Sequence, residues 1–273
     1  MTMTDSIPYL SEETLAGLGI ATFDVIESIE ALIRGGAEDT VWSAPKAVII
    51  PSDGRYMMDN NYRYSLAVMR ACLDQGVQFL YASSAATSGA SETFREEPEF
   101  ERPLNVYGYS KLLFDQVVRR VMPTALSQIV GFRYFNVYGP NQRYDAYGNV
   151  IPIFTNRLLN GLPIIIFGDG EQTRSFLYVD ECLEGIRRLM KSDYMGPVNI
   201  GSEEMLSINK LAEMTMDIAG KKLSINHIPG PLGVRGRNSD NRLIKEKLNW
   251  EPNWPLLKGI QITYKWISDQ LEK

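Results

Sequence analysis

The sequence predicts an α/β fold in which a parallel sheet is followed by a smaller α/β lobe. Short apolar runs that end in proline or in small polar residues alternate with longer segments of helical periodicity. Parallel strands need crossover helices between them, so this alternation favours a parallel sheet. Beyond Pro140 the sequence pattern changes, because the predicted strands and helices are shorter there and are separated by glycines. The second part is therefore expected to form a separate, mixed lobe.

The first half of the chain supplies the alternation. Residues 20–35 place apolar side chains near helical spacing and run into a pair of glycines. Residues 46–50 (KAVII) are typical of a short buried strand, and a proline follows them. Residues 56–75 predict a long helix that ends at Gly76. Residues 77–81 then predict a second strand, which leads into a run of small polar residues.

Three further elements complete the expected architecture. Residues 105–121 predict a helix, residues 128–134 (QIVGFRY) a third strand, and residues 257–272 a closing helix with apolar side chains at helical spacing. The change at Pro140 divides the chain into a sheet domain over residues 1–140 and a lobe over residues 141–273. Some elements of the second part are expected to return to the sheet domain.

Composition narrows the function classes. The 28 basic and 33 acidic residues leave a net charge of −5, which argues against nucleic-acid binding because that binding depends on clustered Lys and Arg. One histidine, His227, cannot build a zinc site or a Ser-His-Asp relay, and no metal is expected. Cys72 and Cys182 lie in apolar segments and are expected to be reduced. No apolar run reaches the roughly 20 residues of a membrane helix, so a cytoplasmic location is expected by default.

The most informative motif is YGYSK at residues 107–111. Positions four apart share one face of a helix, so the Tyr107 hydroxyl and the Lys111 ammonium are expected to be neighbours. A nearby cation favours the phenolate and so lowers the pKa of a tyrosine. Such a tyrosine can remove a hydroxyl proton near neutral pH. Alone, however, the motif is weak evidence, since many helices contain Tyr-x-x-x-Lys by chance.

Two other segments converge on the same place. Ser83 and Ser84 follow a buried-strand pattern, and Asn136 follows the next predicted strand. Ligands of open parallel sheets bind at the carboxyl ends of the strands. The sequence therefore predicts one crevice that contains these side chains and the Tyr107 helix.

Taken together, these motifs resemble the extended short-chain dehydrogenases, and within them the nucleotide-sugar epimerases and dehydratases. The resemblance is carried by SSAAT (83–87), YGYSK (107–111) and FRYFNVYGP (132–140) in this order and spacing. Residues 55–140 are most similar to ADP-glycero-manno-heptose 6-epimerases. Residues 167–273 are more similar to GDP-mannose 3,5-epimerases, through segments such as GDGEQTR, PVNIG and GVRGRNSDN. The fold that this implies is a Rossmann-like sheet domain with a substrate-binding lobe.

The resemblance also implies roles for individual residues. Tyr107 would be the catalytic base, Lys111 its electrostatic partner, and Ser84 the hydrogen-bond donor to the reacting sugar oxygen. The implied cofactor is NAD, with the cofactor-binding positions Asp24, Val25, Asn61, Ser83, Tyr107, Lys111, Tyr134 and Phe135. The implied ligand is a nucleoside diphosphate sugar, held at its diphosphate by Asn136, Arg174 and Arg235. Arginine suits that role because its planar fork pairs two phosphate oxygens at once. A homodimer is left open as the assembly.

The sequence departs from the family at its amino end. The family opens with a strand, a Gly-x-x-Gly-x-x-Gly turn and a helix that binds the cofactor pyrophosphate. Residues 1–40 contain no such turn, so the first βαβ unit is apparently missing and tight cofactor binding is not expected. The second acid/base group of the 6- and 3,5-epimerases is also not apparent. Ala86 occupies the cysteine position, and residues 141–150 contain no lysine.

Two functions stay open at this point. The first is an NAD-dependent nucleotide-sugar epimerase, an isomerase of carbohydrate metabolism that removes a hydride from the sugar and returns it. The second is a truncated or recombined family member that folds and binds a sugar nucleotide without turnover. A 4-epimerase needs no second acid/base group, so the departures above do not exclude the first function. Whether this chain is an active enzyme, and which sugar and carbon it would act on, are left open.

Overall fold

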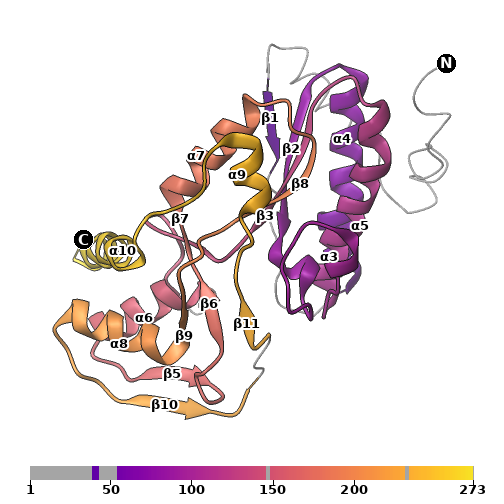
Figure 1. Ribbon diagram of the computed structural model, residues 1–273. Coiled ribbons are helices and arrows are strands. Elements are labelled where there is room, and N and C mark those ends of the chain that lie inside the picture. Colours follow the sequence, from indigo (N-terminus) through magenta and orange to yellow (C-terminus); the bar gives the residue numbers. More distant parts are fainter. Residues whose placement is uncertain (1–38, 43–53, 146–147, 231–233, 273) are drawn as a thin grey trace. The chain divides into compact units, whose positions relative to one another are not determined.

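The computed structural model describes residues 39–42, 54–145, 148–230 and 234–272 (Figure 1). The chain divides into two compact units. Unit 1 comprises residues 1–91, 96–133 and 189–198, and unit 2 comprises residues 92–95, 134–188 and 199–273. The domain boundary expected at residue 140 stays a prediction.

Unit 1 is built on a four-stranded sheet with the strand order β1-β2-β3-β8. Its strands are β1 (Asp39–Trp42), β2 (Gln78–Ser84), β3 (Ile129–Tyr134) and β8 (Gly196–Ile200). Strand β1, which the sequence did not predict, runs parallel to β2 with Thr40 opposite Phe79. The predictions of a helix over residues 20–35 and of a strand over residues 46–50 lie outside the described residues.

Helices cover one face of this sheet (Figure 1). They are α3 (Gly54–Met58), a π-helical turn η3 (Asp59–Arg63), α4 (Tyr64–Asp74) and α5 (Val106–Val121). Short 3₁₀ turns are η4 (Ala85–Ser88), η5 (Pro98–Phe100) and η6 (Met122–Thr124). The helix predicted over residues 56–75 is thus interrupted by the π turn. It is followed by Gly76, whose φ of +69° suits a residue without a side chain.

The core of unit 1 lies between α4, α5 and the sheet. Leu66 and Cys72 from α4 pack with Phe114 from α5 and Phe79 from β2, and each is 0–1% exposed. The Phe79 and Phe114 rings meet edge to face with centroids 6.0 Å apart. The expected α/β architecture with a Rossmann-like parallel sheet is confirmed.

Unit 2 contains three small sheets and five helices among its described residues. Its strands are β4 (Val137–Tyr138), β5 (Ile164–Phe167), β6 (Thr173–Ser175), β7 (Leu177–Tyr178), β9 (Met205–Ser207), β10 (Ile225–Ile228) and β11 (Gly236–Arg237). Its helices are α6 (Val150–Leu159), α7 (Val179–Met190), α8 (Ile208–Ala219), α9 (Arg242–Leu248) and α10 (Leu256–Leu271). The pairs β4–β7, β5–β10 and β6–β11 are parallel, whereas β6–β9 is antiparallel.

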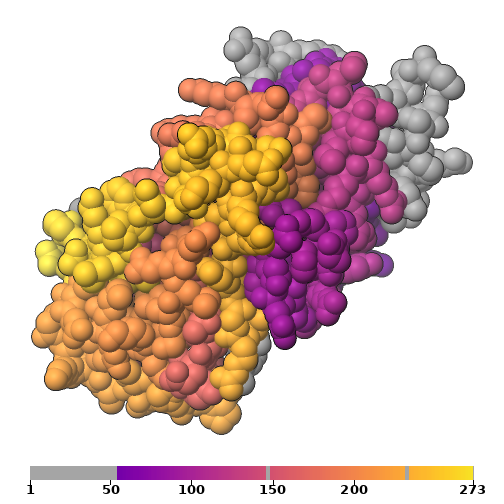
Figure 2. Space-filling view, in the orientation of Figure 1, coloured from indigo at the N-terminus to yellow at the C-terminus, as the bar shows by residue number. Residues whose placement is uncertain are grey.

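The core of unit 2 forms where helices α6, α8 and α10 pack together. Phe154, Leu211 and Ile260, one from each helix, are 0–2% exposed. Figure 2 shows α8 and α10 side by side on the surface in orange and yellow. The closing helix predicted over residues 257–272 is α10. No helix in the described ranges combines the length and apolar character that crossing a membrane requires.

Candidate active site

The carboxyl end of β2 delivers Ser84 into a tight turn. The Ser84 backbone is extended, with φ −158°, and its Oγ accepts a hydrogen bond of 3.1 Å from the Ala86 N–H. The Ser84 carbonyl accepts a second hydrogen bond, 2.9 Å long, from the Thr87 hydroxyl. Ser84 is therefore the N-terminal cap of turn η4, and these contacts fix the position of its backbone at the end of β2.

The first turn of α5 lies directly against η4. Helix α5 begins after Asn105, whose Oδ1 accepts a hydrogen bond of 2.9 Å from the Gly108 N–H. A Cβ added at Gly108 would lie 2.5 Å from the Ala86 carbonyl oxygen, which is closer than real contacts allow. Glycine is therefore required at position 108 for the two turns to touch. As a result, the turn of Ser84 and the helix turn of Tyr107 lie at the same edge of the sheet.

Substitution of Gly108 tests this close approach. We expect Gly108→Ala to destabilise unit 1 by about 1–3 kcal/mol, as overpacking of a filled core does. The free energy of unfolding, measured by urea titration, checks the expectation. Gly161→Ala is not a suitable control because Gly161 has φ +66°, whereas Gly54→Ala is suitable because an added Cβ meets only Val106, at 3.7 Å. Equal stability of the Gly108 and Gly54 variants would contradict the proposed tight contact.

Lys111 lies one helical turn after Tyr107 on α5. It is 4% exposed, and its Nζ donates a hydrogen bond of 2.8 Å to the Ala82 carbonyl oxygen on β2. Burial lowers the pKa of the Lys111 ammonium to about 8, although the Asp115 carboxylate opposes this shift. Tyr107 is partly exposed. A cation fixed on the same helical face as a tyrosine is the arrangement that the YGYSK motif predicted.

Asn61 connects the π turn to the same helix. It is 1% exposed, its Nδ2 donates 3.2 Å to the Ser110 hydroxyl, and that hydroxyl donates 2.7 Å to the Tyr107 carbonyl oxygen. Within the described part of the chain, the Asn61 Oδ1 is buried and accepts no hydrogen bond. A buried acceptor without a donor is unfavourable, so this atom fits a ligand that brings one. Asn61 and Lys111 therefore fit the ribose and nicotinamide side of a dinucleotide.

The other predicted cofactor-binding residues that the structure describes are largely buried and already contact other protein groups. The Ser83 hydroxyl is 3% exposed and donates 3.0 Å to the Asp115 carboxylate. Phe135, in unit 2, is 1% exposed and packs edge to face on Phe94 with ring centroids 6.0 Å apart. Tyr134, also in unit 2, is largely buried, and burial raises the pKa of its phenol. Asp24 and Val25 lie outside the described residues.

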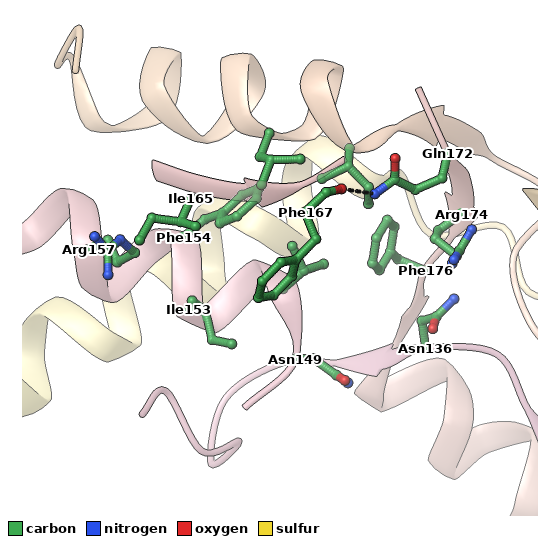
Figure 3. Close-up of a pocket in the computed structure, with 13 residues that line it drawn as sticks. Asn136, Asn149, Ile153, Phe154, Arg157, Ile165, Phe167, Gln172, Arg174 and Phe176 are labelled. Atoms are coloured by element: carbon green, nitrogen blue, oxygen red, sulfur yellow. Dashed lines mark hydrogen bonds between the residues drawn. The ribbon is translucent and has the colours of Figure 1, made fainter. Parts of the chain in front are cut away.

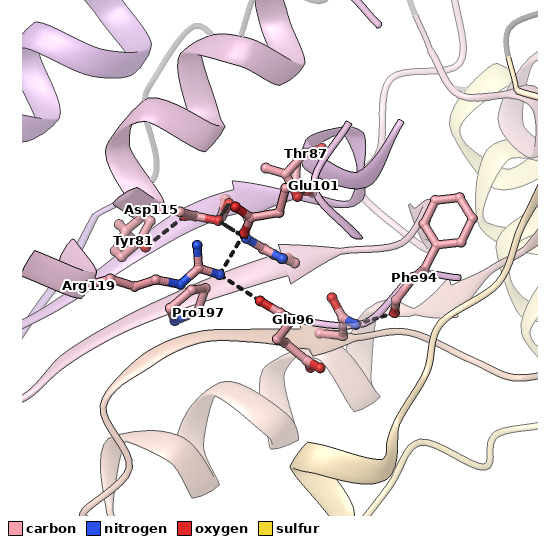
Figure 4. Close-up of polar contacts among 12 residues, drawn as sticks. Tyr81, Thr87, Phe94, Glu96, Glu101, Asp115, Arg119 and Pro197 are labelled. Atoms are coloured by element: carbon pink, nitrogen blue, oxygen red, sulfur yellow. Dashed lines mark hydrogen bonds and ion pairs between the residues drawn. The ribbon is translucent and has the colours of Figure 1, made fainter. Parts of the chain in front are cut away.

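A buried ionic network behind the site was not anticipated from the sequence (Figure 4). Arg133 on β3 donates from Nε to Asp115, 2.8 Å away, and its terminal nitrogen pairs with Glu101. The Tyr81 hydroxyl donates 2.8 Å to the other Asp115 oxygen. Arg119 also pairs with Glu101, at 2.6 Å. The sequence contains one indication of this network: Arg133 interrupts an otherwise apolar strand, and a buried charge requires partners.

Unit 2 contains a pocket of about 510 Å³ (Figure 3). Asn136 and Arg174 line it together with Phe167 and Gln172. Asn136 adopts φ +43°, and its Nδ2 donates 2.8 Å to the Ser175 carbonyl oxygen. The Gln172 amide is held by a hydrogen bond of 3.1 Å to the Phe167 carbonyl oxygen. The pocket is therefore a preformed, largely apolar cavity with a few placed polar groups, as small-molecule sites are.

Arg174 is the cation most suited to an anionic ligand in this pocket. It is half-buried, burial lowers the pKa of its guanidinium, and one terminal nitrogen donates 2.8 Å to the Thr173 carbonyl oxygen. No carboxylate among the described residues forms an ion pair with it, and a partly desolvated cation of this kind favours an anion. Arg235, by contrast, does not line the pocket. Its side chain is 70% exposed and pairs with Asp169 at 3.0 Å.

No metal centre is found in the described part of the chain, where no three His, Cys, Asp or Glu side chains gather. The two cysteines, Cys72 and Cys182, are buried and form no disulfide bond within the described residues. Burial raises the pKa of the Cys182 thiol to about 12, which makes it a poor nucleophile near neutral pH.

The fold and these two groups of residues define a class, the nucleotide-binding α/β proteins of the short-chain dehydrogenase type. The chain belongs to the NAD dependent epimerase/dehydratase family, whose pattern matches residues 51–201. GDP-mannose 3,5-epimerase of Arabidopsis thaliana is 40% identical over 82% of this chain and 62% of its own length. The chain therefore spans less than two thirds of that relative. The resemblance seen in the sequence is confirmed at the level of the family.

Solved structures agree with this assignment. UDP-glucose 4-epimerase from Thermotoga maritima, solved with UDP-glucose, matches with a TM-score of 0.82 at 26% identity over 92% of this chain and 84% of that one. A mutant of UDP-glucuronic acid 4-epimerase from Bacillus cereus, solved with UDP-4-deoxy-4-fluoro-glucuronic acid and NAD, matches with a TM-score of 0.70 at 27% identity. That match covers 78% of this chain and 68% of the other. These two relatives are thus epimerases solved with a nucleotide sugar or its analogue, in the second case beside NAD.

Proposed function

We propose that the protein is an NAD-dependent nucleotide-sugar epimerase that uses Ser84, Tyr107 and Lys111. The observation that carries the proposal is the contact at Gly108, which brings the Ser84 turn against the helix turn of Tyr107 and Lys111. That arrangement suits proton removal from a sugar hydroxyl at the carboxyl edge of a parallel sheet. Unit 1 would supply this chemistry.

Each residue of the site has a distinct part. Tyr107 takes the proton of the sugar hydroxyl and later returns it, while the Lys111 ammonium stabilises the phenolate electrostatically. Ser84 donates a hydrogen bond to the reacting sugar oxygen. Asn61 and Lys111 would hold the cofactor through its nicotinamide ribose. NAD, when bound, supplies a reversible acceptor for the hydride of the sugar carbon.

The residues of the site favour one carbon of the sugar over the others. The side chain of Ala86, the second residue of turn η4, cannot act as an acid or a base, and residues 141–150 contain no lysine. A site with one tyrosine and NAD is sufficient for inversion at C4, which needs no second acid/base group. We therefore propose inversion at C4.

An epimerisation assay tests the proposal. The purified chain is incubated with NAD and, separately, with GDP-mannose, UDP-glucose and UDP-glucuronic acid, which the names of the relatives suggest. Proton NMR of the sugar then shows whether the C4 epimer accumulates. A C4 epimer from any of the three supports the proposal, whereas three unchanged sugars in the presence of saturating NAD would contradict it.

Binding of a nucleotide sugar without turnover is the second candidate. It is favoured by one observation, that every residue lining the pocket comes from unit 2, so the glycine turn missing from the cofactor site takes none of them away. Calorimetric titration with the same nucleotide sugars separates the two candidates. Binding with no epimer formed would favour the second candidate over the first.

Cofactor affinity is expected to be weak. Residues 1–40 contain no glycine turn whose backbone N–H groups would meet the pyrophosphate, while Asn61 and Lys111, which would contact the nicotinamide ribose, are both in the chain. We expect NAD to bind this chain with a Kd of about 1 µM or weaker and to be lost during purification. Calorimetric titration and native mass spectrometry measure both properties. Nanomolar affinity or retained NAD would show that the cofactor site is complete.

Arg174 is expected to dominate binding of the diphosphate. Because it is half-buried in the pocket and forms no ion pair in the described residues, we expect Arg174→Ala to weaken binding of a nucleotide sugar by about 1.5–3 kcal/mol. That loss corresponds to roughly tenfold to 150-fold in Kd.

Two other arginines provide the comparison. Arg157→Ala is the matched control, since Arg157 also lines the pocket and also donates to a backbone carbonyl, but lies at the opposite end from Arg174 and Asn136 (Figure 3). Arg235→Ala tests the third predicted diphosphate ligand, which is exposed and paired with Asp169. Calorimetric titration of all three variants measures the Kd values. Unchanged binding by Arg174→Ala would contradict its assignment.

A further inference from the structure

Helix α5 presents two buried charges to strand β2. Lys111 and Asp115 lie one helical turn apart and are 4% and 0% exposed. Consecutive residues of β2 meet both of them, because the Ala82 carbonyl accepts from Lys111 while Tyr81 and Ser83 donate to Asp115. The two side chains are thus held against the same short stretch of strand.

The Asp115 carboxylate is fixed far more firmly than the lysine. Its two oxygens accept from Tyr81 at 2.8 Å, from Ser83 at 3.0 Å and from the Arg133 Nε at 2.8 Å. These three donors hold both carboxylate oxygens in a fixed position. Lys111 makes one hydrogen bond among the described residues, to a neutral carbonyl. A buried ammonium in that position depends on a nearby negative charge to stay protonated.

We propose that Asp115 is a positioning residue for Lys111: the Asp115 carboxylate, anchored by Tyr81, Ser83 and Arg133 one helical turn along α5, keeps the Lys111 ammonium charged where it meets β2. The inference rests on the proposed function in one respect only: the proposed function makes Lys111 the electrostatic partner of Tyr107. It assigns a purpose to the buried ionic network, which the proposed mechanism does not otherwise use. Burial lowers the pKa of Lys111, and the Asp115 carboxylate is the charge that raises it again.

Other charged and titratable groups face this region from the elements packed on α5. On β3, Arg133 pairs with both Asp115 and Glu101. On the π turn, Asp59 pairs with Arg63. On α5 itself Arg119 pairs with Glu101, and on β2 the Tyr81 phenol, whose pKa burial raises well above its usual value, stays neutral. Turn η4, which also packs on α5, contains no charged residue, whereas α3 contributes the exposed Arg55 and α5 itself the Tyr107 phenol, one turn before Lys111. Asp59 pairs with Arg63 and Glu101 pairs with two arginines, whereas Asp115 lies one helical turn from Lys111. Asp115 is therefore the carboxylate expected to act on Lys111.

The test is a direct titration of Lys111 by NMR in protein carrying ¹³C-labelled lysine. The Lys111 signal is assigned from its absence in Lys111→Arg, and its midpoint is measured without NAD or sugar. Asp115→Asn is the informative variant. Because it leaves Arg133 without one of its partners and so endangers folding, Asp115→Asn/Arg133→Gln removes both charges and provides a second form. Glu101→Gln is the matched control, since Glu101 is equally buried and shares Arg133 but is not on α5.

We expect the midpoint of Lys111 to fall below about 8 in Asp115→Asn, to fall by less in the double variant because it also lacks the Arg133 cation, and to stay near about 8 in Glu101→Gln. A midpoint that falls in neither folded Asp115 variant overturns the proposal. An equal fall in Glu101→Gln also overturns it, since the network would then act only through general stability. This readout needs neither NAD nor turnover. A failure of the proposed epimerase activity would therefore leave the result on Asp115 intact, and the converse also holds.

Discussion

Tyr107→Phe is expected to abolish turnover almost completely while leaving the fold and ligand binding unchanged. The substitution removes only the hydroxyl that would take the sugar proton. A general base contributes on the order of 10²–10⁴-fold to a rate, and we expect kcat for epimerisation to fall by about that factor. The pocket proposed to hold the nucleotide sugar lies in unit 2, so the Kd of the nucleotide sugar is expected to stay the same. Initial rates at saturating NAD and calorimetric titration of the sugar measure the two quantities.

The matched control is Tyr109→Phe. Tyr109 lies on the same helix, two positions further along, and is 50% exposed. Positions two apart do not face each other on a helix, so this hydroxyl is not expected to reach the same substrate atom. Full activity of Tyr109→Phe beside an inactive Tyr107→Phe would assign the base. Turnover that survives Tyr107→Phe would remove Tyr107 from the mechanism and with it the epimerase proposal.

Local sequence signals were sufficient for most of unit 1. The helix expected over residues 105–121 is observed over 106–121 because Asn105 caps it, and the strand expected over 128–134 is observed over 129–134. The strand at β2 is longer than expected and reaches Ser84, since Ser83 points to a buried carboxylate and continues the alternation. Hydrophobic periodicity cannot reveal a partner of this kind.

Two features of the site depend on contacts between distant segments. The π turn that contains Asn61 interrupts a pattern that fits one continuous helix, and nothing in the apolar spacing marks the break. The need for glycine at position 108 is visible only once η4 is placed against α5, because the obstacle is the Ala86 backbone. The motif YGYSK predicted the tyrosine and the lysine but not the reason for the glycine between them.

The pocket in unit 2 was predicted only in part. Asn136 and Arg174 both line it, although 38 positions separate them in the sequence, because β6 lies close to the chain after β3. Arg235 was placed with them by resemblance alone. The chain around it pairs with β6 through the hydrogen bond from Thr173 N–H to the Arg235 carbonyl, yet its side chain turns to Asp169 on the surface. Backbone pairing therefore does not by itself bring a side chain into the pocket.

Arg133→Met is expected to have the largest effect on stability of any single substitution considered. Arg133 is fully buried and contacts both Asp115 and Glu101, whose side chains are 0% and 3% exposed. Methionine approximates its length but leaves two buried carboxylates without their shared cation. Removing one partner of a buried ion pair typically costs about 3–5 kcal/mol.

The comparison that isolates this effect is Arg119→Met. Arg119 pairs with the same Glu101 but retains 20% exposure, so water can partly replace it and the loss should be clearly smaller. Urea titration followed by circular dichroism gives the free energy of unfolding of both variants.

The free energy of unfolding lost in Arg133→Met should depend on pH. Its arginine partners hold the pKa of the Glu101 carboxyl below 4.5 even though burial opposes them. The stability gained from ionised Glu101 is therefore present above pH 4.5 and disappears as the pH falls through its lower folded-state pKa. The difference between Arg133→Met and the unsubstituted chain should accordingly narrow in acid. A difference that is independent of pH, or no larger than that of Arg119→Met, would mean that Arg133 acts by packing and not as the cation of the network.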